Sequence, residues 1–194
     1  MEELIKLLVR DLGDERVKQN IDLSEHMETG LGSLARAFYI ATTKRELIRV
    51  IQLCKELKIK YLVMGSGSKM ALSEKGFEGL VIKNRSDSLK IFGIKGKVSR
   101  AGIGIEEAFL EADSGTSLKR LAEYAARQGL GGLEVLENTL GTLGGSLYIL
   151  PALREKIHQV ETLTPRGVIK VKQLLELSKE DIILSATFKL KAKK

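Results

Sequence analysis

Apolar residues along the first part of the chain follow first a helical spacing and later the spacing of short strands and a further helix. Residues 4–12 place apolar side chains three or four positions apart, which predicts a short helix that Gly13 ends. Residues 20–36 follow with no regular spacing, and their glycines favour an irregular connection. We therefore predict that residues 1–36 form an N-terminal helix and a connection to the rest of the fold.

Residues 37–83 alternate between strand and helix patterns. Thr43 and Glu46, three residues apart, predict a capping box, in which each side chain satisfies a free amide of a helix's first turn. The apolar stripe of that helix includes Cys54, which we interpret as a small core residue rather than a reactive thiol. Short apolar runs typical of strands stand at residues 38–41, 61–64 and 80–82. This order predicts a small α/β lobe.

Residues 84–194 show strand patterns in runs, with helices inserted. One helix is predicted from 117 to 128, with Gly129 as its C-terminal stop. Residues 164–167 are a turn sequence and predict a hairpin. Strand patterns occur at residues 89–94, 97–103, 108–112, 160–163, 168–171 and 182–190. Such runs favour an antiparallel-sheet lobe with helices, so the predicted fold class is α+β with two lobes.

Composition narrows the class of protein. Hydrophobic residues make up 43% of the 194 positions and charged residues 29%, the balance of an ordinary globular domain. No apolar stretch approaches the roughly 20 residues that span a bilayer. The acidic N-terminus does not resemble a signal peptide, and a single cysteine excludes an internal disulfide. We expect a cytoplasmic protein.

The net charge of +7 raises the question of nucleic-acid binding. The lysines are spread along the chain, apart from a short cluster at Lys189, Lys191, Lys193 and Lys194, and no aromatic side chains interleave with them. A solvated basic surface is therefore favoured over a nucleic-acid site. A basic surface also suits an anionic small molecule such as a dinucleotide, and charge alone does not choose between these partners.

The first segment with candidate chemistry follows the apolar run 61–64. It reads Gly65-Ser66-Gly67-Ser68-Lys69. Glycines there allow successive backbone N–H groups to converge, and the serine hydroxyls add donors, so the loop suits a phosphate or pyrophosphate. The loop lacks the G-x-x-x-x-G-K-[ST] spacing of a Walker loop, and it is not a Rossmann fingerprint because position 70, where the third glycine would stand, is Met. Taken alone, a tight solvent turn explains the loop about as well as a ligand does.

The second candidate segment spans residues 138–145 and is rich in glycine. It reads Asn-Thr-Leu-Gly-Thr-Leu-Gly-Gly. Such a segment indicates close approach of the backbone either to a flat ligand or to another part of the chain. The residues alone leave these two interpretations open.

Together and in order, these segments resemble one known family. The pieces are residues 62–68 (LVMGSGS), 76–82 (GFEGLVI), 132–136 (GLEVL) and 141–145 (GTLGG), with the final run 182–190 as the end strand. This pattern resembles the family of UDP-N-acetylenolpyruvoylglucosamine reductase, also called UDP-N-acetylmuramate dehydrogenase. The resemblance spans residues 20 to 190 and implies a two-lobed FAD-binding fold of the vanillyl-alcohol-oxidase type.

The resemblance also implies a non-covalent FAD site. Its loop at residues 65–69 holds the pyrophosphate through backbone amides, and residues 141–145 approach the flavin and its ribityl chain. Ile182 lies by the adenine end, and Gly115 falls in a small-residue turn that also touches the cofactor. The implied site residues are Gly65, Ser66, Gly67, Ser68, Lys69, Met70, Gly115, Leu140, Gly141, Thr142, Gly144, Gly145 and Ile182. With no His or Cys in the first loop, a covalent flavin link is not expected.

The chain departs from the family where substrate is handled. Residues 172–178 lack the Tyr and Arg of the family's Tyr-Arg-x-Ser stretch, and residues 149–154 replace its Asn-Ala-Gly-Ala-Tyr-Gly. The family's substrate domain, with its catalytic serine and glutamate, has no counterpart in this sequence. His26 and His158 lie far from the glycine segments, and no metal-ligand spacing is present. We therefore assign no catalytic residue and no metal site.

Four interpretations follow. The leading one is an FAD-binding module that transfers electrons with a partner or serves a non-catalytic role. Bulky residues at Lys69 and Leu140 favour a second, a cofactor-free domain acting in interaction or regulation, although Lys69 could equally pair with a pyrophosphate oxygen. The third is the FAD subunit of a split oxidoreductase whose substrate domain is a separate polypeptide. Nucleic-acid binding comes last.

Overall fold

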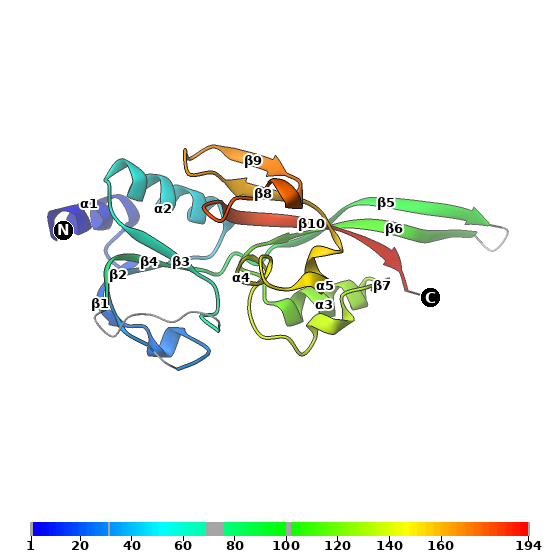
Figure 1. Ribbon diagram of the computed structural model, residues 1–194, viewed down its shortest axis with the longest axis horizontal. Helices are drawn as coiled ribbons and strands as arrows, with labels where there is room; N and C mark the ends of the chain where they lie inside the picture. Colours follow the sequence, from blue (N-terminus) through cyan, green and yellow to red (C-terminus); the bar gives the residue numbers. More distant parts are fainter. Residues whose placement is uncertain (1, 31, 69–75, 100–101, 194) are drawn as a thin grey trace. The chain divides into compact units, whose positions relative to one another are not determined.

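The computed structural model describes residues 2–30, 32–68, 76–99 and 102–193. Lys69 and Met70, two of the predicted cofactor residues, lie outside these residues. The chain divides into two compact units, Met1–Ser86 and Asp87–Lys194 (Figure 1). Among the described residues, no helix is both long and apolar enough to cross a membrane.

The first unit is built on a mixed sheet with the strand order β1-β2-β4-β3. β1 runs antiparallel to β2, whereas β4 runs parallel to both β2 and β3. Because β2, β3 and β4 are parallel, their carboxyl ends share one edge of the sheet. The elements of this unit are α1 (Glu2–Leu12), β1 (Val17–Asp22), the short turn η1 (Ser24–His26), β2 (Leu34–Ala41), α2 (Lys44–Glu56), β3 (Tyr61–Met64) and β4 (Phe77–Asn84).

Both faces of this sheet are covered by apolar side chains. α2 turns a buried stripe inward, which includes Cys54, as its place in the apolar pattern predicts. Burial raises the pKa of the Cys54 thiol to about 12, so the thiol stays protonated and inert. A second cluster combines residues of the connection with residues of the sheet: Leu23, Met27, Phe38, Met64 and Val81. The N-terminal connection therefore forms part of the core.

The predicted cap of α2 is confirmed in one half and different in the other. The Thr43 hydroxyl accepts a hydrogen bond from the Glu46 backbone N–H at 3.1 Å. The Glu46 carboxylate, however, accepts from the backbone N–H and hydroxyl of Thr42 at 2.8 and 2.9 Å, and from Arg16 at 2.8 Å. The Arg16 hydrogen bond holds the pKa of Glu46 at about 2, below its ordinary value of 4.5, against the opposing effect of burial.

Glu46→Gln is expected to lower the free energy of unfolding by about 1–2 kcal/mol near pH 7. The pKa of Glu46 is depressed in the folded state, so the stability contributed by the carboxylate is complete above about pH 4.5 and is lost as the pH falls towards about 2. Urea unfolding of the natural protein and the variant, near pH 7 and near pH 2, should show a difference in stability at neutral pH and none in acid. Glu56→Gln, at the other end of α2, is the control and should change stability by less than about 0.5 kcal/mol. An equal loss at both pH extremes would contradict the assignment.

The second unit is an antiparallel sheet with the strand order β5-β6-β10-β8-β9, and β7 pairs with the end of β10. α3 packs on one face, where its side chains join the main core with residues such as Leu110 and Phe188. The elements are β5 (Leu89–Ser99), β6 (Gly102–Asp113), α3 (Leu118–Arg127), β7 (Leu130–Gly131), η2 (Glu134–Leu136), α4 (Leu143–Ser146), α5 (Pro151–Arg154), β8 (Ile157–Leu163), β9 (Ile169–Lys172), η3 (Leu174–Glu176) and β10 (Ile182–Ala192). The α+β class is confirmed.

Two strand predictions were wrong. Residues 17–22, where no strand was expected, form β1, because pairing with β2 makes an edge strand even though only Val17 is buried. Residues 89–99 and 102–113 form two long strands, β5 and β6, rather than three short ones. Gly93 and Gly96 are accommodated within β5, where the register shifts between Ile91 and Gly93 and between Lys95 and Gly96.

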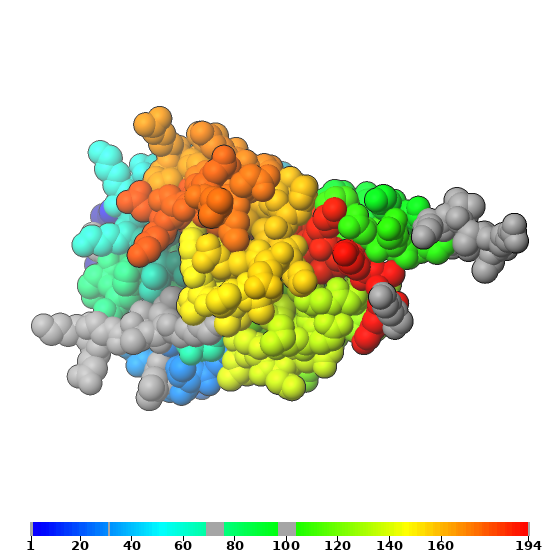
Figure 2. Space-filling model, turned by 45° about the vertical axis from the view of Figure 1, so that its right-hand side comes forward, coloured from blue at the N-terminus to red at the C-terminus, as the bar shows by residue number. Residues whose placement is uncertain are grey.

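The β5–β6 hairpin extends away from the other elements of the second unit, as Figures 1 and 2 both show. It carries large apolar side chains that remain accessible to solvent, with Phe92 51% and Ile94 60% exposed. Phe92 stacks on Phe109, with ring centroids 5.9 Å apart, and Phe109 in turn contacts His158 at 5.0 Å. This hairpin is an exposed apolar surface.

Candidate functional site

The first glycine loop follows β3 directly, at the carboxyl edge of the parallel strands. Its two serines are hydrogen-bonded to each other. The Ser66 hydroxyl donates to the Ser68 hydroxyl at 3.1 Å, and the Ser68 backbone N–H donates to Ser66 Oγ at 3.4 Å. Gly67 has a φ of +76°, a conformation that favours glycine. The residues therefore fold into a tight turn at the sheet edge where parallel sheets bind ligands.

The N-terminal connection braces this loop. The Glu28 backbone N–H donates to the Ser66 carbonyl at 2.9 Å. A Cβ added at Gly67 would stand 2.8 Å from Met27 Cγ, so the absence of a side chain there is required by packing as well as by φ. The connection, predicted to be irregular, holds the loop in place.

A lysine that the sequence analysis did not single out lies at the same edge. Lys83 is paired in register with Met64, the last residue before the loop. Its ammonium group donates to the His26 carbonyl and is half-buried. Burial, and then the nearby Arg85, lower its pKa. The available signal was a charged residue directly after the apolar run 80–82, at the end of a buried strand.

The second glycine segment is paired with the turn that contains Gly115. The Gly144 backbone N–H donates to the Ser114 carbonyl at 2.8 Å, and the Leu143 N–H donates to the Thr116 carbonyl at 2.9 Å. Gly141 accepts in turn from the Leu118 N–H at 3.0 Å, at the start of α3. These three hydrogen bonds span 23 to 30 positions of the chain, so the structure brings together two pieces that the resemblance assigned to one site.

The glycines of this segment differ in what surrounds them. A Cβ at Gly144 would stand 3.0 Å from Ser114 Cβ and 3.2 Å from the Ser114 carbonyl oxygen. At Gly145 the nearest atom would be Thr142 Oγ1 at 3.6 Å, and the residue is exposed. Leu140, which precedes the segment, is 70% exposed. Gly144 therefore serves chain packing, whereas Gly145 and Leu140 face open space.

Two residues that the sequence analysis did not single out, Thr116 and Asp181, carry buried side-chain oxygens next to predicted cofactor residues. Among the described residues no group hydrogen-bonds to Thr116 Oγ1, next to Gly115, or to Asp181 Oδ1, next to Ile182. The other Asp181 oxygen accepts from Lys172 Nζ at 2.6 Å and from the Ser178 N–H at 2.8 Å. Burial alone would raise the pKa of Asp181, but these hydrogen bonds lower it. Ile182 itself is half-buried at the start of β10.

The two histidines are each accounted for by packing. His26 stacks on Phe38 with centroids 4.4 Å apart, and burial followed by the charge of Lys83 lowers its pKa. His158 contacts Phe109. Within the described ranges, no group of three or more His, Cys, Asp or Glu side chains could hold a metal.

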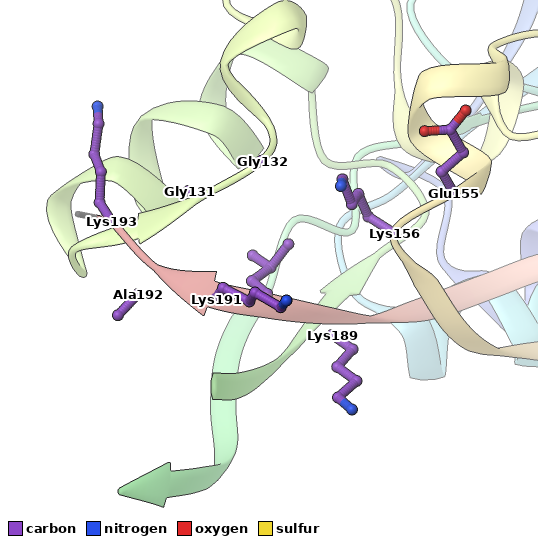
Figure 3. Close-up of a pocket in the computed structure, with 9 residues that line it drawn as sticks. Gly131, Gly132, Glu155, Lys156, Lys189, Lys191, Ala192 and Lys193 are labelled. Carbon is purple, nitrogen blue, oxygen red and sulfur yellow. The ribbon is translucent and has the colours of Figure 1, made fainter. Parts of the chain in front are cut away.

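The last part of the chain that the structure describes, at and just after the end of β10, carries Lys189, Lys191 and Lys193, which line a pocket of about 480 Å³ (Figure 3). None of the predicted cofactor residues that the structure describes lines this pocket. Lys193 and Lys189 point in opposite directions from the strand in Figure 3, and Lys189 pairs with Glu107 at 3.2 Å. The ammonium groups of Lys189 and Lys193 therefore lie on different sides of the strand. The pocket lining consists of Gly131, Gly132, Glu155, Lys156, Lys189, Leu190, Lys191, Ala192 and Lys193.

Known proteins share this sequence pattern. The family described as FAD binding domain matches residues 35–171. The UDP-N-acetylenolpyruvoylglucosamine reductase of Lachnoclostridium phytofermentans is 28% identical over 188 residues, which cover 94% of this chain and 56% of that protein. The second such reductase of Symbiobacterium thermophilum is 30% identical over 149 residues, covering 77% and 44%. The chain thus spans about half the length of these curated relatives.

Solved structures share the fold. UDP-N-acetylenolpyruvylglucosamine reductase from Thermus caldophilus superposes with a TM-score of 0.69 at 23% identity, covering 92% of this chain and 64% of that one. Alkyldihydroxyacetonephosphate synthase gives 0.65 at 17% identity, covering 99% and 40%. These likenesses confirm a fold of the vanillyl-alcohol-oxidase type, and the family match supports FAD as the cofactor. The chain belongs to the FAD binding domain family and corresponds to the flavin-binding portion of the UDP-N-acetylenolpyruvoylglucosamine reductases.

Proposed function

We propose that this chain is a non-covalent FAD-binding module. The observation that carries the proposal is the tight Gly-Ser-Gly-Ser turn at the carboxyl edge of parallel strands, directly after β3. Backbone amides and serine hydroxyls at that edge suit a pyrophosphate. The predicted residues that would hold the pyrophosphate are Gly65, Ser66, Gly67 and Ser68. Lys69 and Met70 stay predictions outside the described residues.

The second unit supports the same proposal. Gly145 and Leu140 face open space, and Thr116 Oγ1 is a buried oxygen without a partner among the described residues. A buried hydroxyl without a partner is rare in folded proteins and suits a missing hydrogen-bonding group. We propose that residues 141–145 and the adjoining turn at Gly115 contact the flavin end, and that Ile182 contacts the adenine. Bound FAD supplies electron or hydride transfer.

Absorption spectroscopy tests the proposal. Purified protein mixed with FAD and passed through a desalting column is expected to keep about one flavin per chain, with the visible bands of the flavin shifted from those of free FAD. A parallel sample denatured with acid should release all of its flavin, because no covalent link is expected. Protein that is folded by circular dichroism but emerges colourless would contradict the proposal and favour the cofactor-free interpretation.

A second candidate function is the FAD subunit of a split oxidoreductase. The exposed Phe92 and Ile94 of the β5–β6 hairpin favour it, because large apolar side chains on a surface mark contact with another polypeptide. Anaerobic titration with NADPH separates the candidates. NADPH alone is expected to reduce the flavin of a module that has its own donor site, whereas the flavin of a split-enzyme subunit is expected to stay oxidised until the partner polypeptide is added.

A further inference from the structure

We propose that Lys83 supplies the positive charge that pairs with the pyrophosphate of FAD at the loop of residues 65–68. The inference rests on the proposed function, and it names a binding residue that neither the sequence pattern nor the family resemblance singles out. It concerns only the first unit, in which the loop, β4 and the N-terminal connection are described together.

The strand register places Lys83 beside the loop. β3 and β4 are parallel, and Lys83 lies opposite Met64, so the side chain leaves β4 at the edge where the chain enters Gly65. Side chains two positions apart on a strand share a face. Lys83 therefore projects on the face of Val81, which packs with Met27 and Leu23 of the connection. The same connection touches the loop through the Glu28–Ser66 hydrogen bond of 2.9 Å.

The charge of Lys83 is incompletely matched. Its ammonium group has three donors, and the hydrogen bond found for it is to the neutral carbonyl of His26. Among the described residues, no carboxylate stands within ion-pair distance of Lys83 Nζ. The charge of Glu28 acts on the Lys83 ammonium group from a greater distance and raises its pKa, whereas the charge of Arg85 lowers it. Placing a half-buried cation next to a neutral oxygen has a cost that a bound anion offsets.

A pyrophosphate is the anion that this arrangement fits. The loop offers backbone amides and two serine hydroxyls, which position phosphate oxygens but carry no full charge. A lysine ammonium is a compact charge on a flexible stem, so it reaches a phosphate oxygen by a change of rotamer from its bond with the His26 carbonyl. Lys83 would then supply the charge-assisted hydrogen bond that the loop lacks.

The test compares FAD affinity among variants by fluorescence titration. Lys83→Met keeps the length and apolar packing of the side chain and is expected to weaken FAD binding by about 10- to 100-fold. Lys83→Arg keeps the charge and should stay within about threefold of the natural protein. Lys60→Met is the matched control: it removes a lysine from the opposite edge of the same sheet, before β3, and should change affinity by less than about twofold.

Salt dependence separates a charge contact from a structural role. FAD affinity of the natural protein should fall as ionic strength rises, and Lys83→Met should show a shallower slope. Circular dichroism and thermal unfolding confirm that the variants are folded. Equal affinities for the natural protein and Lys83→Met, or a loss in Lys83→Met with an unchanged salt slope, would overturn the assignment of Lys83 alone. Failure of the natural protein to take up FAD would instead overturn the proposed function on which the inference rests.

Discussion

Gly144→Val is expected to lower the free energy of unfolding by about 2–3 kcal/mol. A Cβ at this position would stand 3.0 Å from Ser114 Cβ and 3.2 Å from the Ser114 carbonyl oxygen. The hydrogen bond of 2.8 Å from the Gly144 N–H to that carbonyl holds the two segments together, so neither can move away without losing it. Denaturant unfolding of the natural protein and the variant measures the difference.

Gly145→Val is the matched partner of that variant. Its Cβ would meet only Thr142 Oγ1 at 3.6 Å, so stability should change by less than about 0.5 kcal/mol. If Gly145 lies against the flavin, the same variant should weaken FAD binding at least about tenfold while the protein stays folded. Destabilisation by Gly145→Val equal to that of Gly144→Val would show that both glycines serve packing. Unchanged FAD affinity in Gly145→Val would remove this residue from the proposed site.

Gly79→Ala is expected to cost about 3 kcal/mol of folding free energy, although it adds one methyl group. That methyl carbon would stand 2.3 Å from the Lys60 carbonyl oxygen, which also accepts the Leu80 N–H at 2.9 Å. A backbone carbonyl held in this way cannot turn aside as a side chain can. β4 lies between β2 and β3, so a shift of its start disturbs both neighbours and, through β3, the glycine loop.

Gly104→Ala provides the comparison for this second variant. Gly104 also lies in a strand, but a Cβ there has no atom within 4 Å. Thermal or urea unfolding should therefore place Gly104→Ala within about 0.5 kcal/mol of the natural protein and Gly79→Ala well below it. Similar stabilities for the two alanine variants would show that the start of β4 can relax, and would remove the steric explanation for Gly79.

Local interactions account for the elements that the sequence predicted correctly. The cap at Thr43 and the apolar stripe of α2 lie within a few turns of helix, and the turn between β8 and β9 closes through the Thr164 and Gly167 hydrogen bonds. Each depends on residues close together in the chain, so pattern and turn chemistry suffice. The glycine loop after β3 was visible for the same reason, and the order of the glycine segments led to the FAD-binding family.

The partner of the Glu46 carboxylate, the strand β1 and the unbroken strands β5 and β6 could not be predicted in this way. In each case the outcome depends on a segment distant in sequence. Arg16 binds Glu46 across 30 positions, β2 pairs with β1, and pairing with β6 continues along β5 on both sides of its glycines. Pairing across a sheet supplies hydrogen bonds that local propensity does not reveal.

The sequence by itself determined the fold class, the helices α1, α2 and α3 and the two glycine segments, because these follow from spacing and backbone freedom along the chain. Only the tertiary structure decided what each glycine does. Gly144 packs on Ser114 and Gly67 packs on Met27, whereas the position of a side chain at Gly145 is free of close contacts. It also placed Lys83 beside the loop through the β3–β4 register. The physical reason is that close packing and charge placement are properties of residues brought together from distant positions, and spacing along one chain does not contain them.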